Sequence, residues 1–342
     1  MQKTMKFFSD NGYYFKKILI ALITLFSSVI IIFLILRLIP GNVVHEYAIS
    51  LAQKRGISYQ DAYRLAVQLL NFDPSETVFQ QFIRYITGLF SGNLGQSLYV
   101  DDVNVNLLIK QRLPWTLLIT SLALMISFIT GTAMGSFMAR KRKSKRTAAM
   151  NSYIVVAGSM PDYLVGLILV LIFAYQLKIF PAQGNYNIID VTPGFNISFI
   201  LNILYHAFLP VLAFVIVQTG GWALLMRGNA IGVLGDDYVK AAQARGISEK
   251  NIRSKYLKKN AMLPLVTSLA LTFGALFGGS TLMETIFNYP GLGMELASRI
   301  GMKDYFVVQG LMFFTSAIII FINLITDLLY PLIDPRVKKG ES

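Results

Sequence analysis

Six long apolar runs constrain the fold of this 342-residue chain more than any other feature of its sequence. A helix that crosses the hydrocarbon core of a bilayer needs about 20 apolar residues, and each run has this length. The sequence therefore predicts an all-α membrane protein with six transmembrane helices, the first over residues 18–39. The runs occupy residues 18–36, 113–139, 147–177, 207–226, 261–283 and 305–326, and Asp162 is the only charged residue within them.

The charged residues lie mainly between these runs. Lys and Arg outnumber Asp and Glu by 31 to 18, a formal charge of +13, although only 14% of the residues are charged. A nucleic-acid-binding protein carries its basic residues on a solvated face of a soluble core, and this pattern does not predict such a core. With no cysteine and two histidines, disulfides, thiolate chemistry and a His-based metal site are excluded. We expect no nucleic acid, metal or cofactor to bind this chain.

The distribution of Lys and Arg predicts the orientation, because cytoplasmic segments are enriched in both. The N-terminal segment, the loop after the second run, residues 227–260 and the tail together hold 21 of them, and the other segments hold 10. We therefore expect residues 1–17 and 331–342 on the cytoplasmic side. Residues 40–112 would form an extracytoplasmic insert with one or two short helices, and residues 113–330 a five-helix core that includes the cytoplasmic loop.

The predicted spans offer few groups that could bind a proton or a sodium ion. Ionisable residues at membrane depth are costly and mostly functional. Asp162 follows Pro161, whose missing amide donor can break or kink a helix, so Asp162 is either a pore residue or a polar residue satisfied at the kink. No G-x-x-x-x-G-K-[ST] motif occurs, so we expect no P-loop for ATP. These features favour a transporter driven by a separate ATPase; a passive channel, an ion-coupled carrier and an intramembrane enzyme are the alternatives.

Two pairs of glycines, four residues apart, lie inside apolar runs: Gly131 with Gly135, and Gly274 with Gly278. Glycines at this spacing let the backbones of two helices approach closely. They predict either an interface with a second membrane subunit or packing within this chain.

A polar, mostly basic segment, residues 237–264, lies between the fourth and fifth runs. Gly246 can end a helix there in a left-handed turn, and Ser248 can cap a second helix that reaches Leu263 and Pro264. The face of small side chains on the first helix predicts insertion into a cleft on a partner protein; an ordinary basic loop is the alternative. Helical spacing within "DYVKAAQARG" places four residues on that face: Tyr238, Ala241, Ala242 and Arg245.

This segment resembles the cytoplasmic "EAA" loop of ABC importer permeases, in which Glu-Ala-Ala is followed by three residues, a Gly and later a Leu-Pro. Lys240 stands in place of the Glu. Sixteen residues separate Gly246 from Leu263, a spacing similar to that of the oligopeptide/dipeptide/nickel permease subfamily, in which the Glu is often absent. The matching residues are Ala241, Ala242, Gly246, Leu263 and Pro264.

Further blocks in the same order extend the resemblance over nearly the whole chain. "FLILRLIPGN" resembles the exit of the family's first span, and "SMPDYLVGLILVLIFAYQLKIFPAQG" resembles its third span with the loop that follows. "METIFNYPGLGMELASRIGMKDYFVVQG" and "NLITDLLYPLIDPRVKK" are similar to its last outer loop and its tail. Residues 43–70 are the least typical part and look like a local elaboration.

The resemblance implies a type I ABC importer permease fold in a bacterial inner membrane, as the first, B-type, permease of a pair. Besides membrane lipid, its partners would be a second homologous permease, two ATPase subunits that bind ATP and Mg²⁺, and an extracytoplasmic substrate-binding protein. Transport of peptides, or alternatively of nickel or a metal chelate, would proceed by alternating access, and no substrate-contact residue is implied. The implied ATPase-coupling residues are Asp237, Tyr238, Ala241, Ala242, Arg245, Gly246, Leu263 and Pro264.

Overall fold

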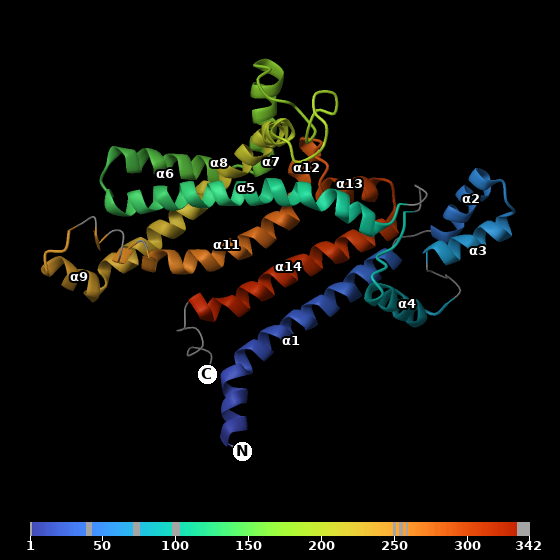
Figure 1. Ribbon diagram of the computed structural model, residues 1–342, viewed down its shortest axis with the longest axis horizontal. Coiled ribbons are helices and arrows are strands. Elements are labelled where there is room, and N and C mark those ends of the chain that lie inside the picture. Colours follow the sequence, from blue (N-terminus) through green and yellow to red (C-terminus); the bar gives the residue numbers. More distant parts are fainter. Residues whose placement is uncertain are drawn as a thin grey trace.

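The computed structural model is almost entirely helical (Figure 1). It describes residues 2–38, 43–70, 76–97, 103–248, 251–252, 256–257 and 259–333. The long helices are α1 (Gln2–Arg37), α5 (Val105–Arg140), α8 (Ile197–Gly235), α11 (Lys259–Gly279) and α14 (Tyr305–Ile333). The shorter ones are α2 (Val43–Arg55), α3 (Tyr59–Leu70), α4 (Val78–Phe90), α6 (Lys145–Gly158), α7 (Asp162–Leu169), η1 (Val170–Gln176), α9 (Asp237–Ala244), α12 (Thr281–Ile286) and α13 (Leu292–Gly301).

Five helices of the described structure are long and apolar enough to cross a membrane, and they correspond to five of the six predicted runs. A sixth span exists if α6 and the α7–η1 segment, which follow one another, are counted as one. The five continuous spans are Gly12–Ile35, Val105–Arg140, Ile197–Gly235, Asn260–Gly278 and Tyr305–Leu329.

The third predicted span, residues 147–177, is sharply broken. α6 and the α7–η1 segment meet at an angle of 97°. Pro161 lies between them with an extended ψ of 140°, and it has no N–H to continue the helical hydrogen bonds. The N–H of Ser159 donates back to the carbonyl of Val155 at 3.2 Å, which closes the last turn of α6. The expected break at Pro161 is confirmed, and the prediction of six spans holds if the bent pair is counted as one span.

The pairing of α5 with α8 forms the centre of the molecule. A Cβ atom on Gly131 would lie 2.6 Å from the carbonyl oxygen of Thr219, and one on Gly135 would lie 2.2 Å from that of Ala223. Real Cβ atoms do not approach so closely, so only glycine permits this distance between the two backbones. In α11, a Cβ on Gly278 would lie 3.2 Å from the Ile319 side chain of α14. These glycines pack against helices of the same chain.

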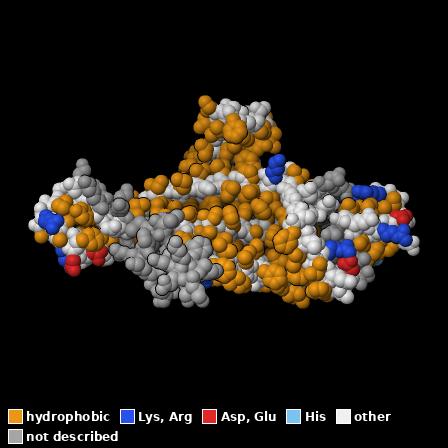
Figure 2. Space-filling view, turned by 60° about the horizontal axis from the view of Figure 1, so that its bottom comes forward, with side chains coloured by type: hydrophobic (Ala, Val, Ile, Leu, Met, Phe, Trp, Pro, Cys, Tyr) orange, Lys and Arg blue, Asp and Glu red, His pale blue; other side chains and the backbone are white. Residues whose placement is uncertain are grey.

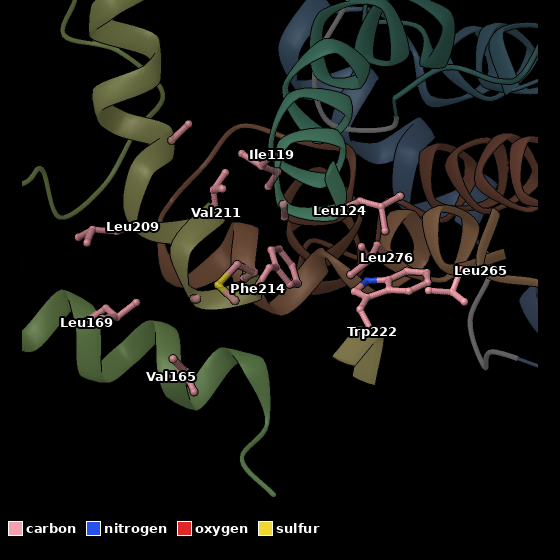
Figure 3. Close-up of a cluster of buried hydrophobic side chains, with 14 of the residues drawn as sticks. Ile119, Leu124, Val165, Leu169, Leu209, Val211, Phe214, Trp222, Leu265 and Leu276 are labelled. Atoms are coloured by element: carbon pink, nitrogen blue, oxygen red, sulfur yellow. The ribbon is translucent and has the colours of Figure 1, made fainter. Parts of the chain in front are cut away.

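A buried hydrophobic core joins α5 and α8 to α7, α11 and α12 (Figure 3). Phe214 of α8 is fully buried, and Trp222 packs edge to face against Phe128 of α5 with ring centroids 5.0 Å apart. Because each of these helices contributes side chains to one cluster, they form a single packed unit. Other members of the cluster are Ile119, Leu124, Val165, Leu169, Leu265 and Leu276.

α1 and α14 lie side by side and run in opposite directions (Figure 1). The hydroxyl of Tyr13 donates to the carbonyl of Asp327 at 3.2 Å, and the ammonium of Lys17 lies 3.6 Å from the Asp327 carboxylate. The start of α1 and the end of α14 therefore lie toward the same end of the bundle. α9 lies at that end, called here the α9 end, and α2 and α3 lie at the opposite or insert end.

The surface also differs between the middle of the molecule and its two ends. Figure 2 shows hydrophobic side chains over the middle of the molecule, whereas Lys, Arg, Asp and Glu gather mainly at its two ends. Such an apolar middle between polar ends is the arrangement that a lipid bilayer requires.

Three short helices follow α1 at the insert end. α2 and α3 pack on each other through a small core of their own, and α4 packs on the end of α1, where the rings of Phe82 and Phe33 are 4.9 Å apart. Thr77 and Gln80 form a capping box that starts α4. α3 and α4 correspond to the predicted short helices, and α2 and α3 together occupy residues 43–70, the segment that looked like a local elaboration. The α2–α3 core consists of Val44, Tyr47, Ala48, Leu51, Ala62 and Ala66.

Candidate functional site

The coupling segment begins with α9, which projects at the α9 end of the bundle (Figure 1). Only Asp236 separates it from the end of α8 at Gly235. Asp237 in its first turn is almost fully exposed and pairs with Lys240 at 2.9 Å. A negative charge in the first turn stabilises a helix, so the pair favours this short helix locally.

The two sides of α9 have different surroundings. Val239 and Ala242 are buried, 0% and 4% exposed, and pack with Ile252 of the same chain. Ala241 and Arg245 are exposed. Of the four residues predicted to share one contact face, Ala242 is thus covered by its own chain, because it packs in a cluster with Val239 and Ile252.

Tyr238 lies at the border of the exposed side and is 42% exposed. Its hydroxyl accepts a hydrogen bond from the Asn260 side chain at 2.9 Å, and its ring stacks on Tyr256 with centroids 6.4 Å apart. Since Asn260 lies in the first turn of α11, Tyr238 ties α9 to the start of the next span.

Gly246 ends α9 in the predicted left-handed turn. Its φ is +73°, and its N–H donates to the Gln243 carbonyl at 2.9 Å, while the Ile247 N–H donates to the Ala242 carbonyl at 3.2 Å. No atom lies within 4 Å of a Cβ built at Gly246. Glycine is therefore favoured by backbone conformation and not by lack of space.

Six of the fourteen residues of the second predicted helix, residues 249–262, lie outside the described structure, and its last four belong to α11. Among the described residues, the Ser248 carbonyl accepts from the N–H of Asn251 at 2.9 Å. Pro264 lies inside α11, which begins at Lys259, so the Leu-Pro pair stands in the first turns of the fifth span. The side chain of Leu263 is outside the described structure.

A pocket of about 680 Å³ separates α9 from the end of α5. Gln243 and Ile247 line it on one side, and Arg140, Lys141 and Arg142 line it on the other. The surface around α9 is therefore basic, as the count of Lys and Arg between the spans predicted.

Asp162 is the first residue of α7, and its Oδ1 accepts a hydrogen bond from the N–H of Tyr163 at 2.8 Å. A carboxylate at a helix N-terminus is favourable. Of the two readings of Asp162, the structure supports a polar residue satisfied at the kink.

A buried carboxylate cluster at the insert end was not found from the sequence. Glu284 of α12 is fully buried, and its Oε1 accepts from the hydroxyls of Thr116 at 2.7 Å and Ser280 at 2.9 Å. Its Oε2 accepts from the N–H of Met294 at 2.9 Å. Burial raises the pKa of Glu284, and these hydrogen bonds act in the opposite direction. A Cβ on Gly291 would lie 2.3 Å from this carboxylate, so the loop before α13 can close over it only with glycine.

A buried ion-pair network lies beside this cluster. Glu295 of α13 pairs with Arg112 of α5 at 3.0 Å and with Arg299 at 2.8 Å. Arg299 also pairs with Asp304 at 3.1 Å, and Ser97 donates to Asp304 at 2.6 Å. The network joins the insert, α5, α13 and the start of α14. No group of three or more residues of the metal-binding types occurs in the part of the chain that the structure describes.

Comparison with known proteins assigns the chain to a family. Residues 131–339 match the family model described as "Binding-protein-dependent transport system inner membrane component". A putative peptide permease protein of Brucella ovis is 32% identical, with 95% of this chain and 98% of the relative aligned. The oligopeptide transport system permease protein AppB of Bacillus subtilis is 26% identical, over 96% of this chain and 99% of the relative. The di/tripeptide transport system permease protein DppB of Pseudomonas aeruginosa is 30% identical, over 92% and 95%.

Among solved structures, a chain of the MetNI methionine ABC transporter in an inward-facing conformation is similar, with a TM-score of 0.53 and 15% identity. The alignment covers 66% of this chain and 96% of that one, so the two share a fold. The predicted resemblance to ABC importer permeases is confirmed. Since the family model covers more than half of the sequence and the Brucella relative covers nearly all of it, this chain belongs to the inner-membrane components of binding-protein-dependent transport systems, the permease subunits of ABC importers.

Proposed function

We propose that this permease imports peptides and that α9 is its contact with an ATPase partner. Relatives that carry peptide permease names align over nearly the full length of this chain, which supports a peptide cargo over nickel or a metal chelate. Two ATPase subunits bind ATP and Mg²⁺, a second permease completes the path, and a binding protein delivers the substrate. This chain itself hydrolyses no ATP.

The two-sided environment of α9 carries the coupling proposal. Val239 and Ala242 anchor the helix to its own chain, while Ala241 and Arg245 remain exposed beside the half-exposed Tyr238. A helix that is fixed on one side and presents exposed alanines between Tyr238 and Arg245 on the other suits insertion into a cleft. Asp237 and Gly246 define its ends, and the turns around Leu263 and Pro264 join the loop to α11. The α9 end is then the cytoplasmic end, and the insert is extracytoplasmic.

The contact is tested by filling its exposed face. Ala241→Trp adds a bulky side chain where the cleft would close, so the ATPases should no longer co-purify with the permease and ATP-driven uptake should be lost. Ala148→Trp is the matched control, because Ala148 is also an exposed alanine near the α9 end, in α6. Normal ATPase association and uptake by the Ala241 variant would show that α9 is not the contact.

Cargo and energy source are tested with the complete transporter in vesicles. We expect inward transport of labelled dipeptides or oligopeptides with hydrolysable ATP and loaded binding protein, unaffected by ionophores. Uptake by this chain alone that collapses with an ionophore would instead indicate an ion-coupled carrier. ATP-driven uptake of Ni²⁺ without any uptake of peptides would replace the proposed cargo.

A further inference from the structure

A small polar pocket lies at the insert end, where α1, α4 and α14 meet, away from α9. Its volume is about 50 Å³. A site for one water needs roughly 10–15 Å³ by this kind of measure, so the pocket holds a few waters or one small ion. It is lined in part by Arg37 of α1, Gln81 and Tyr85 of α4, and Gln309 of α14.

Two buried polar atoms in this pocket make no hydrogen bond within the described structure. They are the hydroxyl of Tyr85 and the Nε2 of Gln309, a residue that is only 6% exposed. Burial raises the pKa of Tyr85 to about 12, while the Gln309 amide, which lies near the phenol oxygen, and the charge of Arg37 act in the opposite direction. The phenol therefore keeps its proton at neutral pH. Leaving such a group unsatisfied costs about 1–3 kcal/mol. Both atoms are hydrogen-bond donors that face the same space.

Arg37 adds a positive charge to these donors. Its Nε donates to Gln81 Oε1 at 3.0 Å, and its guanidinium lies over the Phe33 ring, 3.4 Å from the ring centre. Gln81 is held in this orientation because its Nε2 donates to the Glu76 carbonyl at 3.1 Å. Burial lowers the pKa of Arg37 to about 10, so desolvation makes its charge costly at this position.

Two backbone carbonyls that line the pocket, those of Gly88 and Gly95, are already engaged. The carbonyl of Gly88 accepts from the N–H of Asn93 and from the hydroxyl of Ser91, both at 2.9 Å. The carbonyl of Gly95 accepts from the N–H of Val105 at 3.0 Å. These two carbonyls are therefore not available to water in the pocket, whereas an anion needs donors only.

We propose that this pocket binds one small free anion, a carboxylate such as formate or a halide. Tyr85, Gln309 and Arg37 donate to it, and the ion joins the end of α1 to α4 and α14. The inference does not depend on the cargo or on the role of α9.

The test measures thermal unfolding of the full-length chain in detergent against increasing sodium formate or sodium bromide. Sodium gluconate, whose anion is too large for about 50 Å³, keeps the ionic strength constant. We expect a saturable upward shift of the unfolding temperature for the wild type. Tyr85→Phe and Gln309→Leu each remove one donor with little change of shape, and both should lose this shift. Tyr175→Phe, which changes an exposed tyrosine of η1, should keep it.

Crystals grown in bromide provide the second measurement, because an anomalous peak between Tyr85 and Gln309 would locate the ion directly. Three results would overturn the proposal: no shift in the wild type, an unchanged shift in both donor variants, or a bromide crystal without a peak in the pocket.

Discussion

Replacing Thr116 by valine should destabilise the permease much more than its conservative size suggests. Thr116 is fully buried in α5, and its hydroxyl makes two hydrogen bonds to parts of the chain far away in sequence. It donates to Glu284 Oε1 at 2.7 Å and accepts from the N–H of Leu292 at 2.8 Å. Valine fills the same space without the hydroxyl, so Thr116→Val removes both bonds at once.

The expected loss of unfolding free energy follows from these two bonds. A buried hydrogen bond contributes about 0.5–1.5 kcal/mol, or about 1.5–3 kcal/mol when one partner is charged, and an unsatisfied buried N–H costs about 1–3 kcal/mol. Together they predict a loss of about 2–5 kcal/mol for Thr116→Val. Thr116→Ser keeps the hydroxyl and removes one methyl group, so it should lose only about 1 kcal/mol.

Equilibrium unfolding of the purified full-length chain in mixed detergent micelles measures these values. Thr285→Val is the control, because the Thr285 side chain is exposed and its hydroxyl donates only to the Thr281 carbonyl of its own helix, at 2.7 Å; we expect a change below about 0.5 kcal/mol. Equal losses for the valine and serine variants of Thr116, or a valine variant as stable as the control, would refute the role assigned to the hydroxyl.

Three other consequences of the structure can be measured. Burial raises the pKa of Glu284 above its ordinary value of 4.5. The stability that Glu284 contributes is therefore complete below pH 4.5 and declines as the pH rises through the folded-state pKa. Glu284→Gln should flatten this decline in unfolding curves taken at several pH values. Gly135→Ala should lower the free energy of unfolding by about 1–3 kcal/mol, because its Cβ would meet backbone atoms of α8. Gly232→Ala, at an open position of α8, should instead raise it by about 0.5–1 kcal/mol. Equal effects of the two variants would contradict the packing argument. Single cysteines at Ser58 and Ser144 should react with impermeant reagents from outside and inside the cell respectively, and reversed labelling would invert the proposed orientation.

The spans were predictable because lipid imposes a length and an apolar composition on each helix. The angle at Pro161 was not predictable. The missing N–H shows that a helix ends there, but the direction of α7 depends on its packing against α8 and α12, which is a property of the tertiary structure. Likewise, the spacing of Gly131 and Gly135 indicated close packing without showing that the partner is α8 of the same chain.

The candidate site was predictable in outline only. Gly246 and its left-handed turn follow from local chemistry, and the structure agrees. The burial of Ala242 depends on Ile252, and the cluster around Glu284 depends on Thr116, which lies 168 residues away in the sequence. A single Glu at the end of an apolar run is the only local sign of that cluster, and without its partners it has the appearance of an interfacial residue.

The pair formed by α5 and α8 connects α9 with the carboxylate cluster at the insert end. α8 is a single helix from Ile197 to Gly235, and only Asp236 separates it from α9. The close backbone contacts at Gly131 and Gly135 hold α8 against α5, and Thr116 and Arg112 bind the other end of α5 to α12 and α13. Packed helices of this kind move as bodies because their contacts permit few intermediate arrangements. A displacement of α9 must therefore either bend the chain at Gly235–Asp236 or move α8 and α5 together, and in the second case the carboxylate cluster at the insert end moves with them.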